Sequence, residues 1–567
     1  MSDPAARIEH RQPVTDAALP PELHPVLARV YRNRGVVETG ALDTGLTKLP
    51  PPERLKGSEP AAELIGSVIQ AGETIVVVGD YDCDGATSTA LALDFLPKLG
   101  AARVEFIVPN RFVDGYGLSP SIARQAKALG AGLIITVDNG ISSHAGVAAA
   151  REHGIRTLIT DHHLPGDVLP NADVIVNPNQ PGCTFPSKHL AGVGVMFYVL
   201  MALRRLMRDR GAFESRKPPN LAAGLDLVAL GTVADVVQLD HTNRILVEQG
   251  LRRMRAGHLR PGIRAMLDLA KRPLANLQAS DLGFAVGPRL NAAGRLDDMA
   301  VGIRCLCSRD PAQARGLASQ LHQLNAERRE LEQEMRDHAL SMVQSEDRVG
   351  LCLYDESWHE GVVGLVAGRV KDHFNRPTFA FAPAQEDGWL KGSGRSIPGL
   401  HIRDTLVTLA SRHPGLLERF GGHAMAAGLS LPVAELKRFA QAFDALCREL
   451  IPATALERVY LVDGCLDDEH LAVDTARALE SGGPWGQAFE EPSFEGVFQV
   501  AGMRVVGERH AKYSLRSPGG RRIEAIHFGG ADVAKTSGQI QAVYRLVVNR
   551  FRDAENAELQ LLAQWPA

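Results

Sequence analysis

The chain has 567 residues, of which 45% are hydrophobic and 23% are charged, the balance of an ordinary soluble globular protein. This length suits three or four domains, and no run of about 18 apolar residues predicts a membrane span. The formal net charge of −4 excludes a uniformly basic chain, but it allows an acidic site beside a basic groove.

The N-terminal 60 residues are rich in proline and predict a packed arm with one helix, at residues 21–34. They lack the basic segment and apolar core of a secretory signal. The seven cysteines of the whole chain are scattered and form no CxxC pair, which indicates a reduced, cytoplasmic protein.

From residue 73 onward, apolar runs alternate with helix-like stretches. The runs at 74–80, 104–108, 133–137 and 157–160 predict strands, and those at 86–99, 119–129 and 143–153 predict the helices between them. Such alternation indicates a parallel sheet in an α/β architecture. Further helices are predicted at 192–210 and 221–233.

The second half of the chain predicts three more parts. Residues 311–345 have leucines at helical spacing among charges, which indicates one long connecting helix. A second α/β unit opens with a strand at 349–354, and short strands separated by glycine turns follow after about residue 455. These strands predict a small β-barrel, for which the OB-fold is the best candidate. We therefore predict an N-terminal arm (1–60), a parallel-sheet catalytic domain (61–310), a connecting helix (311–346), a second α/β domain (347–453) and a C-terminal barrel (454–567).

Acidic and imidazole side chains follow three of the predicted strands and one predicted helix. They are Asp80, Asp82 and Asp84 after the first strand, Asp138 after the third, Asp161, His162 and His163 after the fourth, and Asp235 after the helix at 221–233. A single aspartate after a strand is usually a helix cap or a turn former. However, ligands of an open parallel sheet bind at the carboxyl ends of its strands, so these clusters should converge. Carboxylates packed this closely would repel one another unless cations neutralised them, and mixed carboxylate and imidazole ligands suit Mn²⁺ or Mg²⁺.

The order of these motifs resembles that of the DHH phosphoesterase superfamily: DYDCDG (80–85), VDNG (137–140), DHH (161–163) and TVADVVQLD (232–240). Further segments narrow the resemblance to the bacterial RecJ exonucleases, namely residues 108–119, 287–298, 358–369 and 420–431. The resemblance implies two divalent cations, with Asp82, Asp84, Asp138, His162 and Asp235 as metal ligands. It also implies catalytic roles for Asp80, Asp161 and His163, where His163 is either a ligand or a proton donor. How the ligands divide between the two metals stays open.

The same resemblance implies a set of substrate-binding residues. In the catalytic domain these are Arg111, Tyr116, Arg289, Asn291 and Arg295. In the DHH-associated domain, which holds the 5′ end of the strand in such enzymes, they are Ser393, Arg395, Ser396, Gly422 and His423. Glycine lets a backbone approach phosphate oxygens closely, while serine, arginine and histidine add donors, although a lone arginine or a GxG segment more often serves a loop or turn.

The predicted barrel adds an independent indication of nucleic-acid binding. Ten Lys/Arg residues stand against three acids between residues 504 and 552, interleaved with Tyr513, Phe528, Tyr544 and Phe551. Basic residues with stacking aromatics suit a groove for a single strand. Some of these aromatics, Phe528 among them, could instead belong to the barrel core.

The resemblance implies a processive 5′→3′ exonuclease that degrades single-stranded DNA to mononucleotides in recombination and repair. Single-strand-binding protein and a recombination helicase would be its partners, and a cytoplasmic monomer is the expected form. One alternative is a DHH phosphodiesterase for a small substrate, such as an oligoribonucleotide or a cyclic dinucleotide. A second is a noncatalytic DNA-binding scaffold.

Overall fold

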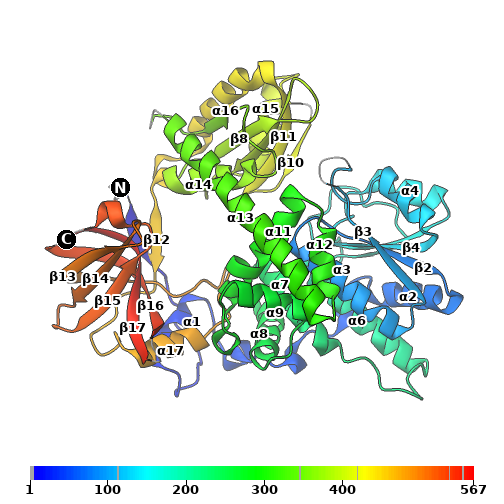
Figure 1. Cartoon of the computed structure of the whole chain (residues 1–567), viewed down its shortest axis with the longest axis horizontal. Coiled ribbons are helices and arrows are strands. Elements are labelled where there is room, and N and C mark those ends of the chain that lie inside the picture. The colour runs from blue at the N-terminus through cyan, green and yellow to red at the C-terminus, as the bar shows by residue number, and fades with distance from the viewer. Residues whose placement is uncertain (1–5, 111–113, 344–346, 418, 535–536, 552–553) are drawn as a thin grey trace. The chain divides into compact units, whose positions relative to one another are not determined.

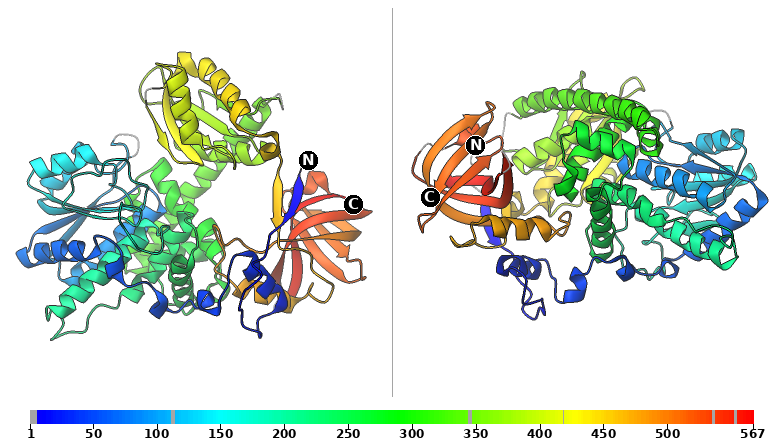
Figure 2. Two further views of the ribbon diagram at one scale, coloured as in Figure 1. Left: turned by 180° about the vertical axis from the view of Figure 1, so that it is seen from behind. Right: turned by 60° about the horizontal axis from the view of Figure 1, so that its bottom comes forward.

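The computed structural model describes residues 6–110, 114–343, 347–417, 419–534, 537–551 and 554–567. The chain divides into two compact units, one formed by residues 10–325 with 462–567, the other by residues 326–461 with the segment up to residue 9 (Figure 1). Strand β1 (Arg7–His10) pairs with β12 (Val459–Val462), as Figure 2 shows, so the start of the chain is tied to a distant segment. Of the helices described, none is long and apolar enough to span a bilayer.

The larger unit contains the parallel sheet that the sequence predicts. Its strand order is β3-β2-β4-β5-β6, with β2 (Thr74–Val78), β3 (Arg103–Ile107), β4 (Ala131–Val137), β5 (Arg156–Thr160) and β6 (Val174–Val176). The three-residue β6 was not predicted because it is too short to show a pattern. Since β2 lies between β3 and β4, the strand order reverses beside β2, and a ligand crevice forms at such a switch point.

Helices cover both faces of this sheet. Val76, Val78 and Ile134 pack under α4 (Pro120–Ala128) and α5 (His144–Glu152). The alternate residues Ile75, Val77 and Ile135 belong to the main core with α2 (Ser58–Ala71), α3 (Cys83–Phe95) and α6 (Gly192–Asp209). Strands buried on both faces explain the continuous apolar runs from which the sheet was predicted.

A helical layer follows the sheet. It contains α7 (Leu225–Ala234), α8 (His241–Arg255), α9 (Pro261–Leu269), α10 (Ala279–Asp281), a π-helical turn (Leu282–Val286), α11 (Gly287–Leu296) and α12 (Ala300–Cys307). The predicted helix at 221–233 begins instead with a 3-10 turn, Leu221–Gly224. The other helices in this layer were not predicted.

The long helix α13 (Pro311–Met342) runs in the chain from the larger unit into the smaller one, as the sequence predicts. The smaller unit has a mixed sheet of order β10-β11-β9-β8-β7, with β7 (Leu351–Tyr354), β8 (Thr378–Pro383), β9 (Trp389–Arg395), β10 (Arg419–Gly422) and β11 (Ala426–Pro432). Its helices are α14 (Val363–Phe374), α15 (Ile402–Arg412) and α16 (Leu436–Leu450), and Phe379, Phe381, Phe439 and Phe443 fill its core. This confirms a second α/β part.

The C-terminal segment forms a closed five-stranded barrel, in agreement with the predicted OB-fold. Its strands are β13 (Phe494–Val506), β14 (His510–Arg516), β15 (Arg522–His527), β16 (Gln539–Phe551) and β17 (Ala554–Pro566), joined in the order β13-β14-β15-β17-β16. Helix α17 (Val473–Ser481) precedes the barrel and packs on β16. The final strand, β17, is not among the strands that the sequence predicted.

A buried ion pair ties the N-terminal arm to the start of the barrel segment. The arm carries α1 (Pro25–Asn33), shorter than the predicted 21–34, and Arg34 follows it. The Arg34 guanidinium donates to both carboxylate oxygens of Asp463, at 2.7 and 3.1 Å, and Asn33 donates to the same carboxylate at 2.9 Å. Both members of the pair are fully buried, which makes each of them dependent on the other.

We expect Asp463→Ala to lower the free energy of unfolding by about 3–5 kcal/mol, because it leaves the buried Arg34 charge with only the more distant carboxylate of Glu490, 3.6 Å away. The measurement is a urea unfolding curve of the full chain. Glu63→Gln is the matched control, since it breaks a pair with Arg210 whose side chains are both exposed, and it should cost under about 1 kcal/mol. Equal effects of the two substitutions would contradict a structural role of the buried pair.

Candidate metal centre and catalytic site

The clusters that the sequence placed at strand ends meet at the carboxyl edge of the parallel sheet. Three sets of side chains bring their ligand atoms within 4.8 Å of one another, namely Asp80, Asp82 and Asp138; Asp84, His162 and Asp235; and Asp138, His162 and His163. Asp138 and His162 each belong to two of these sets. The structure thus brings all five predicted metal ligands together with Asp80 and His163.

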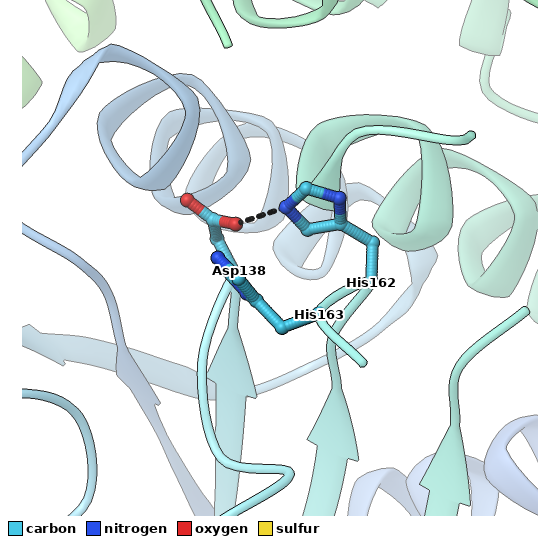
Figure 3. Close-up of side chains that lie close together, drawn as sticks. All are labelled: Asp138, His162 and His163. Atoms are coloured by element: carbon cyan, nitrogen blue, oxygen red, sulfur yellow. Dashed lines mark ion pairs between the residues drawn. The ribbon is translucent and has the colours of Figure 1, made fainter. Parts of the chain in front are cut away.

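His162 lies at the centre of this arrangement. Its Nε2 is 3.0 Å from Asp138 Oδ1 and 3.4 Å from Asp235 Oδ2. Figure 3 shows the Asp138 carboxylate directed at the His162 ring, with His163 beside it on the same loop. Asp138 has a φ of 62°, a left-handed conformation that aspartate adopts more readily than most residues. Asp235 reaches the site from the C-terminal end of α7.

Asp84 is held by the start of helix α6. Its Oδ1 accepts from the Val193 amide at 3.0 Å and its Oδ2 accepts from the Gly192 amide at 2.5 Å. A Cβ at Gly192 would lie 2.6 Å from the Asp138 Cβ, so only glycine permits this approach. The site therefore requires glycine as the first residue of α6.

The pKa shifts of these carboxyl groups have a common cause. Burial raises the pKa of Asp84 to about 7, aided by the charge of Asp82 and opposed by the two amide hydrogen bonds. Burial also raises the pKa of Asp138 and of Asp235 far above the usual value, and the neighbouring aspartates add to both shifts. Divalent cations would remove this repulsion, and the oxygen and imidazole donors fit Mn²⁺ or Mg²⁺.

Asp161 is fully buried, and its carboxylate contacts backbone amides and the ring of His163, which belongs to one candidate metal set. Its Oδ1 accepts from the amides of His162 and His163 at 2.7 and 3.0 Å and lies 2.8 Å from His163 Nδ1. Its Oδ2 accepts from the Ile141 amide at 2.9 Å. Burial opposes the charged forms, but the hydrogen bond between the two side chains lowers the pKa of Asp161 and raises the pKa of His163 to about 9. Asp161 thus orients His163 and favours its protonated form.

Asn139 has a role at this edge that the sequence analysis missed. Its buried Nδ2 donates to the carbonyls of Val78 and Val137 at 3.0 and 2.9 Å, so it ties the end of β2 to the end of β4. Its position next to Asp138 in VDNG was the available signal.

Tyr116, a predicted substrate residue, also reaches the site, where its hydroxyl donates to the Asp138 carbonyl at 2.9 Å and lies 3.4 Å from His163 Nδ1.

The other predicted substrate residues of the larger unit have varied surroundings. Asn291 Oδ1 accepts from the Cys83 amide at 2.7 Å and so supports the loop after β2. Arg289 is buried, donates to the Ala285 carbonyl and lies 3.0 Å from His322 Nδ1. Arg295 is in the last turn of α11, and Arg111 lies outside the described residues. Their contacts with a substrate stay predictions.

The predicted substrate residues of the smaller unit gather at one end of its sheet. Arg395 at the end of β9 donates to Ser393 Oγ at 3.1 Å, and Ser396 Oγ donates to the Leu400 carbonyl at 2.7 Å. Ala426 of β11 pairs with Arg395, and its neighbour Ala427 pairs with Gly422, which is followed by His423. Of these residues, Ser393, Arg395, Gly422 and His423 are at least partly exposed, whereas Ser396 is buried.

Two of the four barrel aromatics named in the sequence analysis lie in the core, and the other two are exposed to solvent. Tyr513 and Tyr544 are fully buried in the core, whereas Phe528 is 55% and Phe551 is 65% exposed. The suggestion that Phe528 belongs to the core was wrong. His510 packs edge-on against Phe528, which lies in the turn after β15, with ring centroids 5.3 Å apart. Arg504, Arg516 and Arg522 are exposed on β13, β14 and β15.

A parallel sheet that collects aspartates and an Asp-His-His segment at its carboxyl edge defines the DHH class of phosphoesterases. In agreement, the sequence model of the "DHH family, N-terminal domain" matches residues 74–232, and that of the "DHHA1 domain" matches residues 347–449. The "RecJ OB domain" model matches residues 462–563, over the barrel.

The chain belongs to the RecJ family. It is 49% identical to "Single-stranded-DNA-specific exonuclease RecJ" of Escherichia coli (strain K12), over 99% of both chains. It is 50% identical to the protein of that name from Dickeya dadantii, over 98% of both chains. The crystal structure of RecJ from Thermus thermophilus in complex with Mn²⁺ matches with a TM-score of 0.83 at 29% identity, over 99% of this chain and 79% of that one. Its complex with Mg²⁺ matches with a TM-score of 0.77 at 28% identity, over 99% and 78% of the two chains.

We expect Asp138→Asn to stabilise the metal-free protein and to remove most of its stabilisation by Mn²⁺. Asparagine has the same shape as aspartate and tolerates the left-handed backbone at residue 138. The substitution removes one carboxylate that repels its neighbours, and this carboxylate is also one of the candidate metal ligands. Calorimetric titration should show at least a tenfold loss of Mn²⁺ affinity, about 1.4 kcal/mol. Asp209→Asn, which alters an exposed carboxylate paired with Arg208, serves as the control. A metal-free melting temperature lower than that of wild type would argue against mutual repulsion.

Proposed function

We propose that this chain is a metal-dependent exonuclease that degrades single-stranded DNA from its 5′ end and releases mononucleotides. The observation that carries the proposal is the convergence of Asp80, Asp82 and Asp138 with His162 at one sheet edge, in a chain of the RecJ family. The relatives are named as single-stranded-DNA-specific exonucleases, and the identity extends over the whole chain, barrel included. Polarity, mononucleotide products and a role in recombination and repair are inferred from this kinship.

Two divalent cations, Mn²⁺ or Mg²⁺, would be held by Asp82, Asp84, Asp138, His162 and Asp235. Such ions, when bound, supply a water that ionises readily and charge stabilisation for the phosphate oxygens. The chain itself contributes the close packing of the carboxylates and the imidazole of His162 between two of them. Asp80, buried at the end of the first strand, would support this set.

His163 is the residue that we assign to proton transfer. His163 Nδ1 donates a hydrogen bond to Asp161 Oδ1, which fixes the ring, and we assign proton donation to the leaving oxygen to the other ring nitrogen, Nε2. The Tyr116 hydroxyl lies beside the same ring and limits its rotation. The fixed ring orientation suits a donor that must meet one oxygen of the phosphodiester.

Single-strand binding would use the barrel and the smaller unit. Exposed Phe528 can stack on a base whatever its identity, and the exposed arginines of the barrel can follow the backbone. Ser393, Arg395, Gly422 and His423, supported by the buried Ser396, would hold the 5′ end, and Arg111, Arg289, Asn291 and Arg295 would contact the strand. Binding that depends on phosphates should weaken strongly as the salt concentration rises.

Neither alternative function fits as well. A small-substrate phosphodiesterase has no use for the barrel with its exposed aromatics and arginines, and a noncatalytic scaffold has no reason to keep a complete ligand set. We further propose that the enzyme is a cytoplasmic monomer that meets its substrate on single-strand-binding protein and works beside a recombination helicase.

The direct test is degradation of an end-labelled single-stranded oligonucleotide with Mn²⁺ or EDTA, by wild type and Asp138→Asn. A block at the 5′ end should stop the reaction, a block at the 3′ end should not, and a duplex with flush ends should survive. Tight binding without cleavage under all conditions would favour the scaffold, while hydrolysis of dinucleotides alone would favour the small-substrate enzyme.

We expect Asp161→Asn to lower kcat by about 10²–10⁴-fold, because the contacts that orient His163 and favour its protonated form are weakened, with little change in KM for DNA. Steady-state kinetics at saturating Mn²⁺ measure both parameters. Asp167→Asn, in the exposed part of the following loop, should behave as wild type. A change confined to KM would assign Asp161 to strand binding instead.

A further inference from the structure

The larger unit contains a cavity of about 500 Å³ that the catalytic residues do not use. Its walls come from the end of α7, the π-helical turn Leu282–Val286, helix α17 and strand β16. It therefore lies between the part of the unit that carries the metal centre and the barrel. Its volume falls within the range of sites for small organic groups.

Two residues that line this cavity are exposed and serve no core. Phe284 is 84% exposed, and it sits in a π-helical turn, a feature that often marks functional sites. Val236 is 63% exposed and has a φ of 60°, a conformation that is strained for a β-branched residue. Val236 directly follows Asp235 in the chain. An exposed aromatic and a strained aliphatic residue at one cavity indicate a site that is completed by a ligand.

The charged residues that line the cavity indicate what kind of ligand it can bind. Among the described lining residues Arg545 is the only cation, and it pairs with Glu491 at 2.7 Å. Glu480 pairs with Arg550 at 2.6 Å, and Glu490 lies 3.3 Å from Arg11. The cavity thus offers apolar walls and neutralised charges rather than a cation for a phosphate. Ser280 and Gln487 add exposed polar groups.

We propose that this cavity is a base-binding subsite for the single-stranded DNA substrate, in which Phe284 stacks on one face of a base and Val236 packs beside it. The proposal rests on the proposed function. A base has an apolar π-face, which matches the apolar walls of the cavity, and a polar edge, which matches Ser280 and Gln487. The phosphate of the same nucleotide would stay outside the cavity. Because Val236 adjoins Asp235, an occupied subsite would also restrain the backbone next to a candidate metal ligand.

The test uses the full-length protein and separates binding from cleavage. Equilibrium binding of a fluorescent single-stranded oligonucleotide is measured with Asp138→Asn as the background, alone and combined with Phe284→Ala, Phe284→Leu or Phe284→Trp. Because Phe284 is exposed, melting temperatures should not fall. We expect affinity to decrease by about 5- to 140-fold for Ala and nearly as much for Leu, and to be kept by Trp.

A scan with single abasic sites at successive positions locates the base. In the Asp138→Asn background one position should lose affinity as strongly as Phe284→Ala does, and the two changes together should cost no more than either one. Unchanged affinity of Phe284→Ala, or additive losses at every position, would overturn the subsite. Full affinity of Phe284→Leu would also overturn it and would favour an apolar side chain of a protein partner. If wild type degrades single-stranded DNA while these results fail, only the subsite is refuted; if it does not, the proposed function fails.

Discussion

Several aspartates are crowded together at one edge of the parallel sheet, and the rest of the structure must offset the free-energy cost of this crowding. Asp80, Asp84, Asp138 and Asp161 are each at most 5% exposed, in surroundings where like charges repel strongly. Such an edge stabilises nothing by itself, so its free-energy cost must be offset elsewhere. Strands buried on both faces and one continuous core that extends from the sheet to the barrel provide that offset.

Local backbone features then determine whether the carboxylates can come close enough to share cations. The start of α6 can approach because residue 192 has no side chain, and Asp138 turns inward because its backbone adopts a left-handed conformation. Asn139 joins two strand ends that would otherwise be free to separate at the switch point of the sheet. Each of these features sets a position rather than contacting a substrate, so the ligand set depends on the fold around it.

The sequence predicts most of this site because its signals are local. An apolar run followed by an acidic residue identifies both a strand and its carboxyl end, and the parallel sheet then requires the ends to meet. Asn139 was missed because its role is visible only when β2 and β4 lie side by side. Helix α8 was missed because arginines interrupt its apolar stripe, and Arg244, buried over the ring of Phe489, shows how tertiary contacts override such a pattern. Phe528 was misjudged because it lies one residue beyond the end of β15, in a turn that continues the strand-like sequence pattern.

Metal ions that polarise a phosphate do not distinguish one strand from two, since both present the same phosphodiester. Groups that recognise what only a single strand exposes, the face of an unpaired base, can supply this selectivity. Phe528 on the barrel and Phe284 at the cavity are both exposed aromatics in the unit that carries the metal centre. In a duplex the base faces are already covered by their neighbours, so stacking on either ring first requires unstacking. A chain that separates phosphate chemistry from base stacking can be indifferent to sequence and still reject the duplex.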